Sequence, residues 1–321
     1  RLWTYSDSCN MKHEGCCAES AVEDARRVCD KLGIDFYVMN FKDMFKDKVV
    51  DYFVDEYIHG RTPNPCIACN KYLKFDALLK KALAMGIDYV ATGHYAKIEK
   101  GEDGKYILRA SEAVKKDQSY VLYNFTQEQL AHTLMPLGGY NKDWVRQKAE
   151  ELGLGVAHKP DSQEICFVED DDYAKFITDY SGYKPKEGDI LDVNGNVIGK
   201  HRGLIYYTIG QRKGIGAYGR PMFVMKIDAE NNTITLGEKG MEFSNELTAY
   251  DVNFVSGEFP KENMLITAKV RYQAPPAAAM LCPQKDGTVK LMFPEPQRAV
   301  TPGQAVVFYD GDIVLGGGTV L

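Results

Sequence analysis

The chain has 321 residues, of which 45% are hydrophobic and 26% charged, a mixture typical of folded globular proteins and not of disordered ones. One hydrophobic core rarely serves more than about 250–300 residues, so this length predicts two or three domains. The net charge of −6 argues against a protein that binds nucleic acid through overall positive charge, although a local basic face stays compatible with it.

The cysteines indicate the compartment. Eight in a chain of this length are too sparse for a secreted disulfide scaffold, and only Cys66 and Cys69 have a close, chemically characteristic spacing. No signal peptide is visible, and no apolar run reaches the roughly 20 residues of a membrane span, so we expect a cytoplasmic protein. The chain opens on Arg1 in what reads as the end of a strand, and we expect an incomplete N-terminus.

The first half alternates helix-like and strand-like segments, which predicts crossover units on a parallel sheet. Helical spacing of apolar residues covers 16–32 and continues from Phe45 to Tyr57. Short apolar runs at 34–41 and 89–92 predict strands, 59–69 reads as a loop, and a helix is expected over about 70–84. Two later helices follow, one with a capping box of Thr126 and Gln129 and one carrying Trp144.

The pattern changes after Phe167. The acidic run 169–172 precedes a short predicted helix, and glycines and prolines then separate short strands. From about residue 238 the chain reads as β only, with strands at 265–273, 289–293, 305–309 and 313–315, which predicts a small barrel or sandwich. We therefore place domains at 1–167, 168–237 and 238–321.

The stretch from Gly60 to Asn70 is the most informative one, because two prolines stiffen a loop that carries Cys66 and Cys69 to a helix start. A helix N-terminus favours the thiolate form of a nearby cysteine. Two buried cysteines or half of a structural zinc site are the alternatives, but a second close ligand pair is not apparent. The spacing favours redox or metal chemistry.

Three further stretches carry candidate residues. Cys166 follows a charged, proline-containing loop; alone it reads as a core cysteine, but with Cys69 it makes a resolving or sulfur-carrying partner. Gly93 and His94 follow a predicted strand, where open α/β sheets bind ligands, although a structural histidine is equally consistent. The run 115–120 reads as a solvated turn, and 200–214 combines cations with tyrosines in a pattern compatible with RNA contact.

Taken together, these stretches resemble the tRNA-specific 2-thiouridylases, the MnmA/TrmU family. The likeness follows the family's order over nearly the whole chain, in the segments 62–70, 92–95, 116–120, 161–167, 203–216 and 301–304. The resemblance implies an α/β domain of the ATP-pyrophosphatase (adenine nucleotide alpha hydrolase-like) type with a doubly wound parallel sheet. A small central domain and a C-terminal β-barrel would follow it.

The resemblance also implies a reaction. ATP and Mg²⁺ serve to adenylate O2 of the wobble uridine of certain tRNAs, and persulfide sulfur then displaces AMP to leave 2-thiouridine. The enzyme is a sulfurtransferase, and a cysteine desulfurase or a sulfur-relay protein is its expected donor.

The resemblance also implies a role for each residue that matches a position in the family's motifs. Cys69 falls at the family's nucleophile and Cys166 at its persulfide carrier, and a disulfide between them is compatible with the cycle. Asn64, Pro65 and Cys66 fall where the family contacts the target base, and Gly93 where it contacts ATP. The positions that match tRNA contacts are His94, Lys116, Asp117, Gln118, Arg271, Tyr272 and Gln304.

Two departures from the family pattern stand out. Many members carry Asp where this chain has Cys66, and Cys66, Cys69 and Cys166 together would make the ligand set of a [4Fe–4S] cluster with one open iron. This favours the cluster slightly and leaves the persulfide route open. The family's Ser-Gly-Gly-Xaa-Asp-Ser phosphate loop would precede Arg1, so we expect this chain to bind ATP poorly or not at all.

Two rival functions remain. An amidating synthetase of the ATP-pyrophosphatase group would need no paired thiols. A non-catalytic RNA-binding or iron–sulfur scaffold protein would bind tRNA without any response to ATP. The ordered motifs favour the thiouridylase over both.

Overall fold

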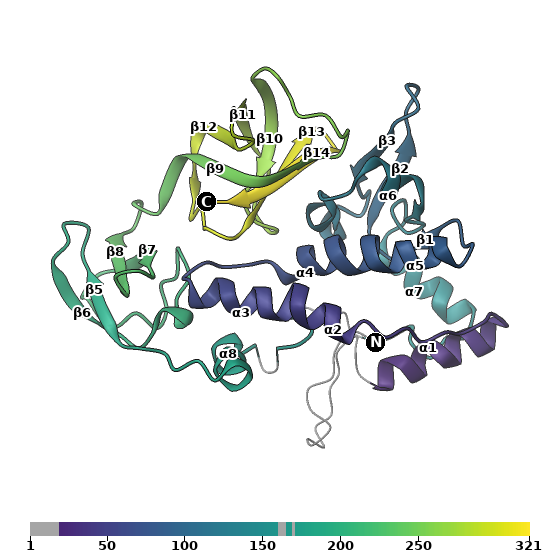
Figure 1. The fold of residues 1–321 in the computed structure, drawn as a ribbon, viewed down its shortest axis with the longest axis horizontal. Coiled ribbons are helices and arrows are strands. Elements are labelled where there is room, and N and C mark those ends of the chain that lie inside the picture. Colours follow the sequence, from purple (N-terminus) through teal and green to yellow (C-terminus); the bar gives the residue numbers. More distant parts are fainter. Residues whose placement is uncertain (1–18, 160–164, 169–170) are drawn as a thin grey trace.

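A computed structural model describes residues 19–159, 165–168 and 171–321. Figure 1 shows a β-barrel above a layer of helices, a small sheet at one end of the molecule and helix α1 toward the other. No helix in these described ranges has both the length and the apolar character that a bilayer crossing requires.

Two long helical runs form the layer below the barrel. Along the described chain, the α-helices are α1 (Glu19–Leu32), α2 (Lys42–Phe45), α3 (Asp51–Ile58), α4 (Pro65–Ala68), α5 (Leu78–Ala84), α6 (Gln127–Ala131), α7 (Lys142–Glu151) and α8 (Tyr173–Ser181). A π-helical turn, η1 (Lys46–Val50), joins α2 to α3, and a longer one, η2 (Cys69–Ala77), joins α4 to α5. The first run is α2-η1-α3 and the second is α4-η2-α5. The predicted apolar face is confirmed, since Phe45, Val49, Phe53 and Tyr57 are all buried in one cluster.

The parallel sheet of the first domain appears as one strand pair. Strand β1 (Val90–Ala91) lies parallel to β4 (Thr133–Leu134), as the alternating pattern predicted. The expected strand at 34–41 is wrong for the described structure, in which this segment has no regular secondary structure and joins no sheet. Ile34, Tyr37 and Val38 are 56%, 71% and 54% exposed, so no described element covers their apolar side chains.

The C-terminal region is a closed six-stranded barrel, which confirms the predicted β domain. Its strands are β9 (Phe243–Phe254), β10 (Met264–Lys269), β11 (Ala277–Pro283), β12 (Val289–Arg298), β13 (Ala305–Asp310) and β14 (Ile313–Val320). The order β13-β10-β11-β12-β9-β14 closes through the β13–β14 pair. The hairpin of β2 (Ala96–Lys100) and β3 (Tyr106–Ala110) extends this sheet beside β14.

The central sheet has four strands in the order β6-β5-β8-β7. These are β5 (Gly188–Leu191), β6 (Val197–His201), β7 (Met222–Asp228) and β8 (Thr233–Glu238), and short helical turns lie at η3 (Val114–Lys116), η4 (Ser119–Leu122) and η5 (Leu204–Tyr206). Its core takes in Ala299 from the barrel, so the two units share apolar packing.

The cysteine-bearing helix, α4-η2-α5, lies between two hydrophobic cores. Ala68, Cys69 and Leu73 belong to the core made with α2, α3 and α8. Ile67 and Phe75 belong instead to a core shared with the barrel strands β13 and β14. The barrel therefore takes part in fixing the position of this helix (Figure 1).

Candidate functional site

The helix that carries the cysteines begins at Pro65, earlier than predicted. Asn64 caps it, and its Oδ1 accepts hydrogen bonds from the Cys66 amide at 3.1 Å and the Ile67 amide at 3.4 Å. Asparagine at the cap and proline at the first helical position are both favoured at helix starts. Cys66 and Cys69 thus lie in the first two turns of a helix and not in the loop before it.

The two thiols of the pair occupy different surroundings. Cys66 is exposed, whereas Cys69 is 8% exposed and packs in the core that also holds Phe167 and Val168. Ile165 packs against the same core, and Cys166, between Ile165 and Phe167, is exposed. The structure therefore brings the segment of Cys166 against the helix of Cys69, as their predicted partnership requires.

The described cysteines do not form a metal centre. No three Cys, His, Asp or Glu side chains in the described ranges are placed to hold a metal ion. The structure thus gives no support to Cys66, Cys69 and Cys166 as cluster ligands. Residues 161–164 of the Cys166 motif lie outside the described part of the chain.

A turn of the barrel holds the loop that leads into this helix. The Thr62 amide donates to the Pro302 carbonyl at 2.9 Å, and the Gln304 Nε2 donates to the carbonyls of Thr62 at 2.8 Å and Pro63 at 3.4 Å. The side-chain amide of Gln304 is therefore engaged within the protein.

Gly303 lies at the centre of that turn with φ +87°. A Cβ added there would fall 3.0 Å from both the Cβ of Arg61 and the amide nitrogen of Thr62. Only a glycine allows the turn to approach the loop this closely.

The segment after β1 contains a buried histidine. His94 is 9% exposed, its Nδ1 lies 2.9 Å from the Thr92 Oγ1, and its ring centre lies 5.6 Å from that of Phe75. Burial, with a smaller contribution from Lys74, lowers the pKa of His94 to about 3. A neutral imidazole offers no charge to a phosphate, which agrees with the structural alternative for this residue.

In contrast to the buried His94 side chain, the backbone at Gly93 has free space beside it. The heavy atom nearest to a Cβ added there would be Leu137 Cδ1, at 3.7 Å. A ligand at the carboxyl end of β1 therefore meets no crowding from this position.

The run 115–120 is not simply a solvated turn, so that interpretation was wrong. The Asp117 carboxylate accepts from the Ser111 amide at 2.9 Å and from the amide and hydroxyl of Ser119 at 3.2 and 2.7 Å. Tyr120 is fully buried and donates to the Ala305 carbonyl at 2.6 Å. The Gln118 side chain accepts from the Tyr95 amide at 3.0 Å, which ties the run to the segment after β1.

Arg271 and Tyr272 differ in orientation although they are adjacent. The Arg271 Nη2 donates to the carbonyls of Ile209 at 3.0 Å and Ala299 at 2.8 Å, and to the Thr301 hydroxyl. Tyr272 is 40% exposed and donates to the Asp117 carbonyl at 3.0 Å. Burial first, then charge interactions that include Asp117 and the Cys66 thiol, raise the pKa of Tyr272, which places its ring near that thiol.

The sequence analysis missed Lys269, two residues before Arg271 at the end of β10. Its Nζ lies 5.9 Å from the ring centre of Tyr120 and 5.8 Å from that of Tyr272. The signal in the sequence is a lysine that ends a mostly apolar strand.

The basic stretch 200–214 is only partly available for contact. Lys200 pairs with Asp189 at 2.6 Å, and His201 is buried, so neither presents an open cation. Arg202 stacks over Tyr206 at 4.0 Å, while Arg212 and Lys213 are exposed.

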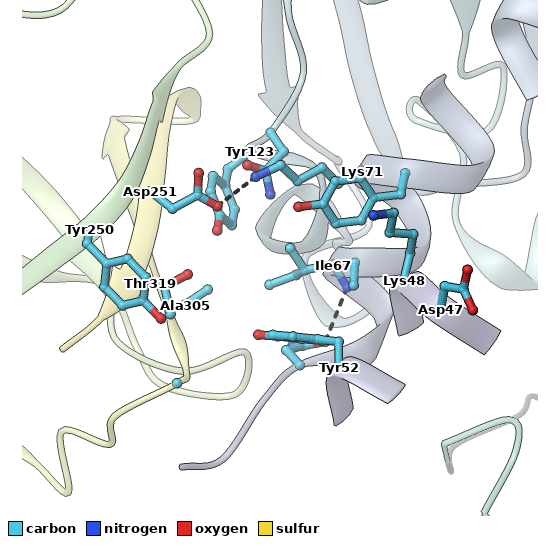
Figure 2. Close-up of a pocket in the computed structure, with 15 residues that line it drawn as sticks. Asp47, Lys48, Tyr52, Ile67, Lys71, Tyr123, Tyr250, Asp251, Ala305 and Thr319 are labelled. Carbon is cyan, nitrogen blue, oxygen red and sulfur yellow. Dashed lines mark hydrogen bonds and ion pairs between the residues drawn. The ribbon is translucent and has the colours of Figure 1, made fainter. Parts of the chain in front are cut away.

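A cavity of about 390 Å³ lies between α4-η2 and the barrel. Figure 2 shows Tyr52, Ile67 and Tyr250 around it, with the Lys71 ammonium reaching the Asp251 carboxylate. None of the described cysteines lines this cavity, so it is separate from the thiols.

Comparisons with known proteins match all three parts of the chain. Residues 1–170 match the family model of the tRNA methyl transferase HUP domain, 174–238 that of the tRNA methyl transferase PRC-barrel domain, and 244–320 that of the aminomethyltransferase beta-barrel domain. A tRNA-specific 2-thiouridylase MnmA of Acetivibrio thermocellus is 57% identical over 323 residues, covering 100% of this chain and 90% of the relative. Relatives of the same name from Clostridioides difficile and Clostridium beijerinckii are 56% and 54% identical, each covering 100% of this chain and 89% of the relative.

Proposed function

Because the chain belongs to the family of tRNA-specific 2-thiouridylases, we propose that it is a sulfurtransferase that converts the wobble uridine of tRNA to 2-thiouridine with ATP. The observation that carries this proposal is the 57% identity over the whole chain, which covers the α/β domain, the central domain and the barrel together. The exposed Cys66 and the packing of the Cys69 and Cys166 segments support it at the level of the site.

The chemistry proceeds in two displacements. The uridine O2 attacks the α-phosphorus of ATP and pyrophosphate leaves, which makes O2 a good leaving group as part of AMP. The Cys69 thiolate then attacks the inner sulfur of a Cys166 persulfide and releases sulfide, which attacks C2 and expels AMP. A Cys69–Cys166 disulfide results, and a thiol reductant must reduce it before the next turnover.

ATP with Mg²⁺ is the cosubstrate of this family, and the end of β1 is the part of the described chain that suits it. The open backbone at Gly93 allows close approach, in the place where α/β sheets bind nucleotides. When bound, ATP supplies the adenylyl group; Gly93 contributes space at the binding site.

The tRNA surface that we propose joins the 116–118 run, Tyr272 and the start of α4. Tyr272 and Lys116 retain exposed parts and contact the RNA directly. The remaining candidates shape that surface from within, because their polar groups are engaged in the protein; they are His94, Asp117, Gln118, Arg271 and Gln304. Cys66, Asn64 and Pro65 lie beside the target base.

The sulfur donor that we propose is a cysteine desulfurase or a relay protein in a reducing cytoplasm, because Cys166 is exposed to such a partner. The cluster route is the second candidate, and Cys66 is the residue that favours it. Iron and sulfide bound to anaerobically prepared protein, and lost in Cys66→Ser, would establish that route. Full activity of iron-free protein would exclude it.

The reaction is tested directly on the protein extended at its N-terminus by the family's phosphate-loop segment, with unmodified tRNA, ATP, Mg²⁺ and a sulfur source under anaerobic conditions. Thiolated tRNA is retarded in a mercury-containing gel, and we expect Cys69→Ser to abolish the retarded band. The matched control is Cys282→Ser, a cysteine of barrel strand β11 away from the thiol helix, which leaves the band intact. A band that persists in Cys69→Ser would contradict the role of this thiol.

Absence of the band with this extended protein, its cysteines unchanged and its binding of ATP verified, would contradict the proposed function itself. ATP hydrolysis with an amine acceptor would then favour the synthetase. Binding of tRNA that ATP does not change would favour the scaffold.

A further inference from the structure

We propose that Lys269, and not Arg271, is the barrel cation that binds a phosphate of the RNA beside the target nucleotide. This inference rests on the proposed function and names a residue that neither the motifs nor the comparisons assign. Three observations carry it, namely the place of Lys269, its charge environment and the inward orientation of Arg271.

Lys269 lies next to the thiol site. It ends strand β10 opposite Val307 of β13, and its Nζ lies within 6 Å of the ring centres of Tyr120 and Tyr272. Tyr272 in turn interacts with the Cys66 thiol and reaches the Asp117 carbonyl. A cation at this point is close to the place where the target base would enter.

The Lys269 ammonium is partly buried without a carboxylate at ion-pair distance in the described part of the chain. Asp117 is the acidic group that acts on it, but three hydrogen bonds from Ser111 and Ser119 already engage that carboxylate. Burial lowers the pKa of Lys269, since water is removed from the charged form. A bound anion compensates the charged ammonium for the hydration that it loses on burial.

Arg271 has the opposite character. Its Nη2 makes three hydrogen bonds to Ile209, Ala299 and Thr301, and its Nε is buried away from solvent. Burial lowers its pKa as well, yet its hydrogen bonds point toward the protein. A guanidinium held in this way cannot turn to a phosphate without releasing the junction between barrel and central sheet.

A phosphate is the anion that fits, because RNA carries one at every nucleotide and lysine binds phosphate as a compact point charge. The exposed ring of Tyr272 beside the ammonium offers a surface on which a base can stack. Lys269 and Tyr272 therefore hold one nucleotide together: the ammonium binds its phosphate, and the tyrosine ring stacks on its base.

The test compares Lys269→Met with Lys285→Met, which removes the same charge from the exposed turn between β11 and β12 of the same barrel. The dissociation constant for unmodified tRNA is measured against salt concentration by filter binding. Loss of one phosphate contact lowers the slope of log Kd against log salt by about one unit. We expect this change in Lys269→Met alone, and its restoration in Lys269→Arg.

An unchanged slope in Lys269→Met, with thermal stability and wild-type binding intact, would overturn the inference. A fall in the slope with Arg271→Gln, which removes the charge, but not with Lys269→Met would assign the contact to Arg271 instead. If the wild-type protein neither binds nor thiolates tRNA, the proposed function fails before the inference is reached, so the two failures are distinguishable.

Discussion

At the scale of single residues, burial decides what each candidate side chain can do. His94 follows the strand where a ligand was expected, but its imidazole is 9% exposed and bonded to the Thr92 hydroxyl. Cys66 and Cys69 are three residues apart, yet one is exposed and the other lies in a core. Residue type and spacing identify candidates for a site, and the packing then assigns them different roles.

The buried His94 makes the fold sensitive to acid. Its pKa is about 3 in the folded protein and about 6.5 when unfolded, so between these values the unfolded state binds more protons. The free energy of unfolding therefore falls as the pH drops below about 6.5, by up to about 1.4 kcal/mol per pH unit for this one group.

Urea unfolding at pH 7.5, 6.5 and 5.5 checks this expectation in the wild type and in His94→Asn. The variant loses packing at every pH, so the slope against pH and not the absolute stability is compared. We expect a shallower acid slope in His94→Asn, with His158→Asn, at an exposed site, as the control. Equal slopes in all three proteins would show that His94 titrates normally.

At the scale of elements, the turn at 301–304 and the start of α4 form one unit. The turn accepts from the Thr62 amide and donates to the Thr62 carbonyl, so a loop of the barrel fixes the direction in which the cysteine helix begins. Gly303 permits that contact.

Gly303→Ala is expected to destabilise the protein by about 1–3 kcal/mol, because the new Cβ meets Arg61 and Thr62 and the residue has a positive φ. Displacement of α4 should also lower the thiolation rate. Gly287→Ala is the matched control, since φ there is +85° and nothing lies within 4 Å of the added Cβ. Thermal midpoints and the mercury-gel assay measure both effects, and equal losses in the two variants would mean that the contact with the loop is unimportant.

The elements that the sequence predicted well are those whose cause is local. The apolar period from Phe45 to Tyr57 and the capping box at Thr126 need only their own neighbours, and both are confirmed. The start of α4 was missed because the Asn64-Pro65 pair was interpreted as loop, although it is also a helix-start signal. The 115–120 run was mistaken because Tyr120 bonds to Ala305, which a local pattern cannot show.

The candidate site was predictable to the same degree. The spacing of Cys66 and Cys69 is visible in the sequence, whereas the partnership of Cys69 with Cys166, whose neighbours pack in the core of Cys69, stays a prediction. The environment of Lys269 could not, since it depends on Tyr120 in a distant segment. The roles of the site residues and the domain boundaries at 167 and 237 remain predictions.

At the scale of the whole molecule, the three parts share their cores. Ile205 of the central region packs in the core of Cys69, and Ala299 of the barrel packs in the core of the central sheet. Gly210 lies so close to Ala299 that an added Cβ would fall 2.6 Å from the alanine Cβ. The barrel, the central sheet and the helices therefore support one another at the site.

Arg271 is the polar link at that junction, and its loss should loosen the central sheet before the barrel. A lysine retains the charge but not the planar fork, so Arg271→Lys leaves buried acceptors at Ile209 and Ala299 poorly satisfied, at a cost of about 2–4 kcal/mol. Hydrogen exchange followed by mass spectrometry should then show faster exchange over residues 204–216, with β9–β13 unchanged. Arg220→Lys, an exposed arginine of the central sheet paired with Glu238, serves as the control and should leave both regions protected. Uniform acceleration across the barrel as well would mean that Arg271 stabilises the molecule generally and does not act as a link between two of its parts.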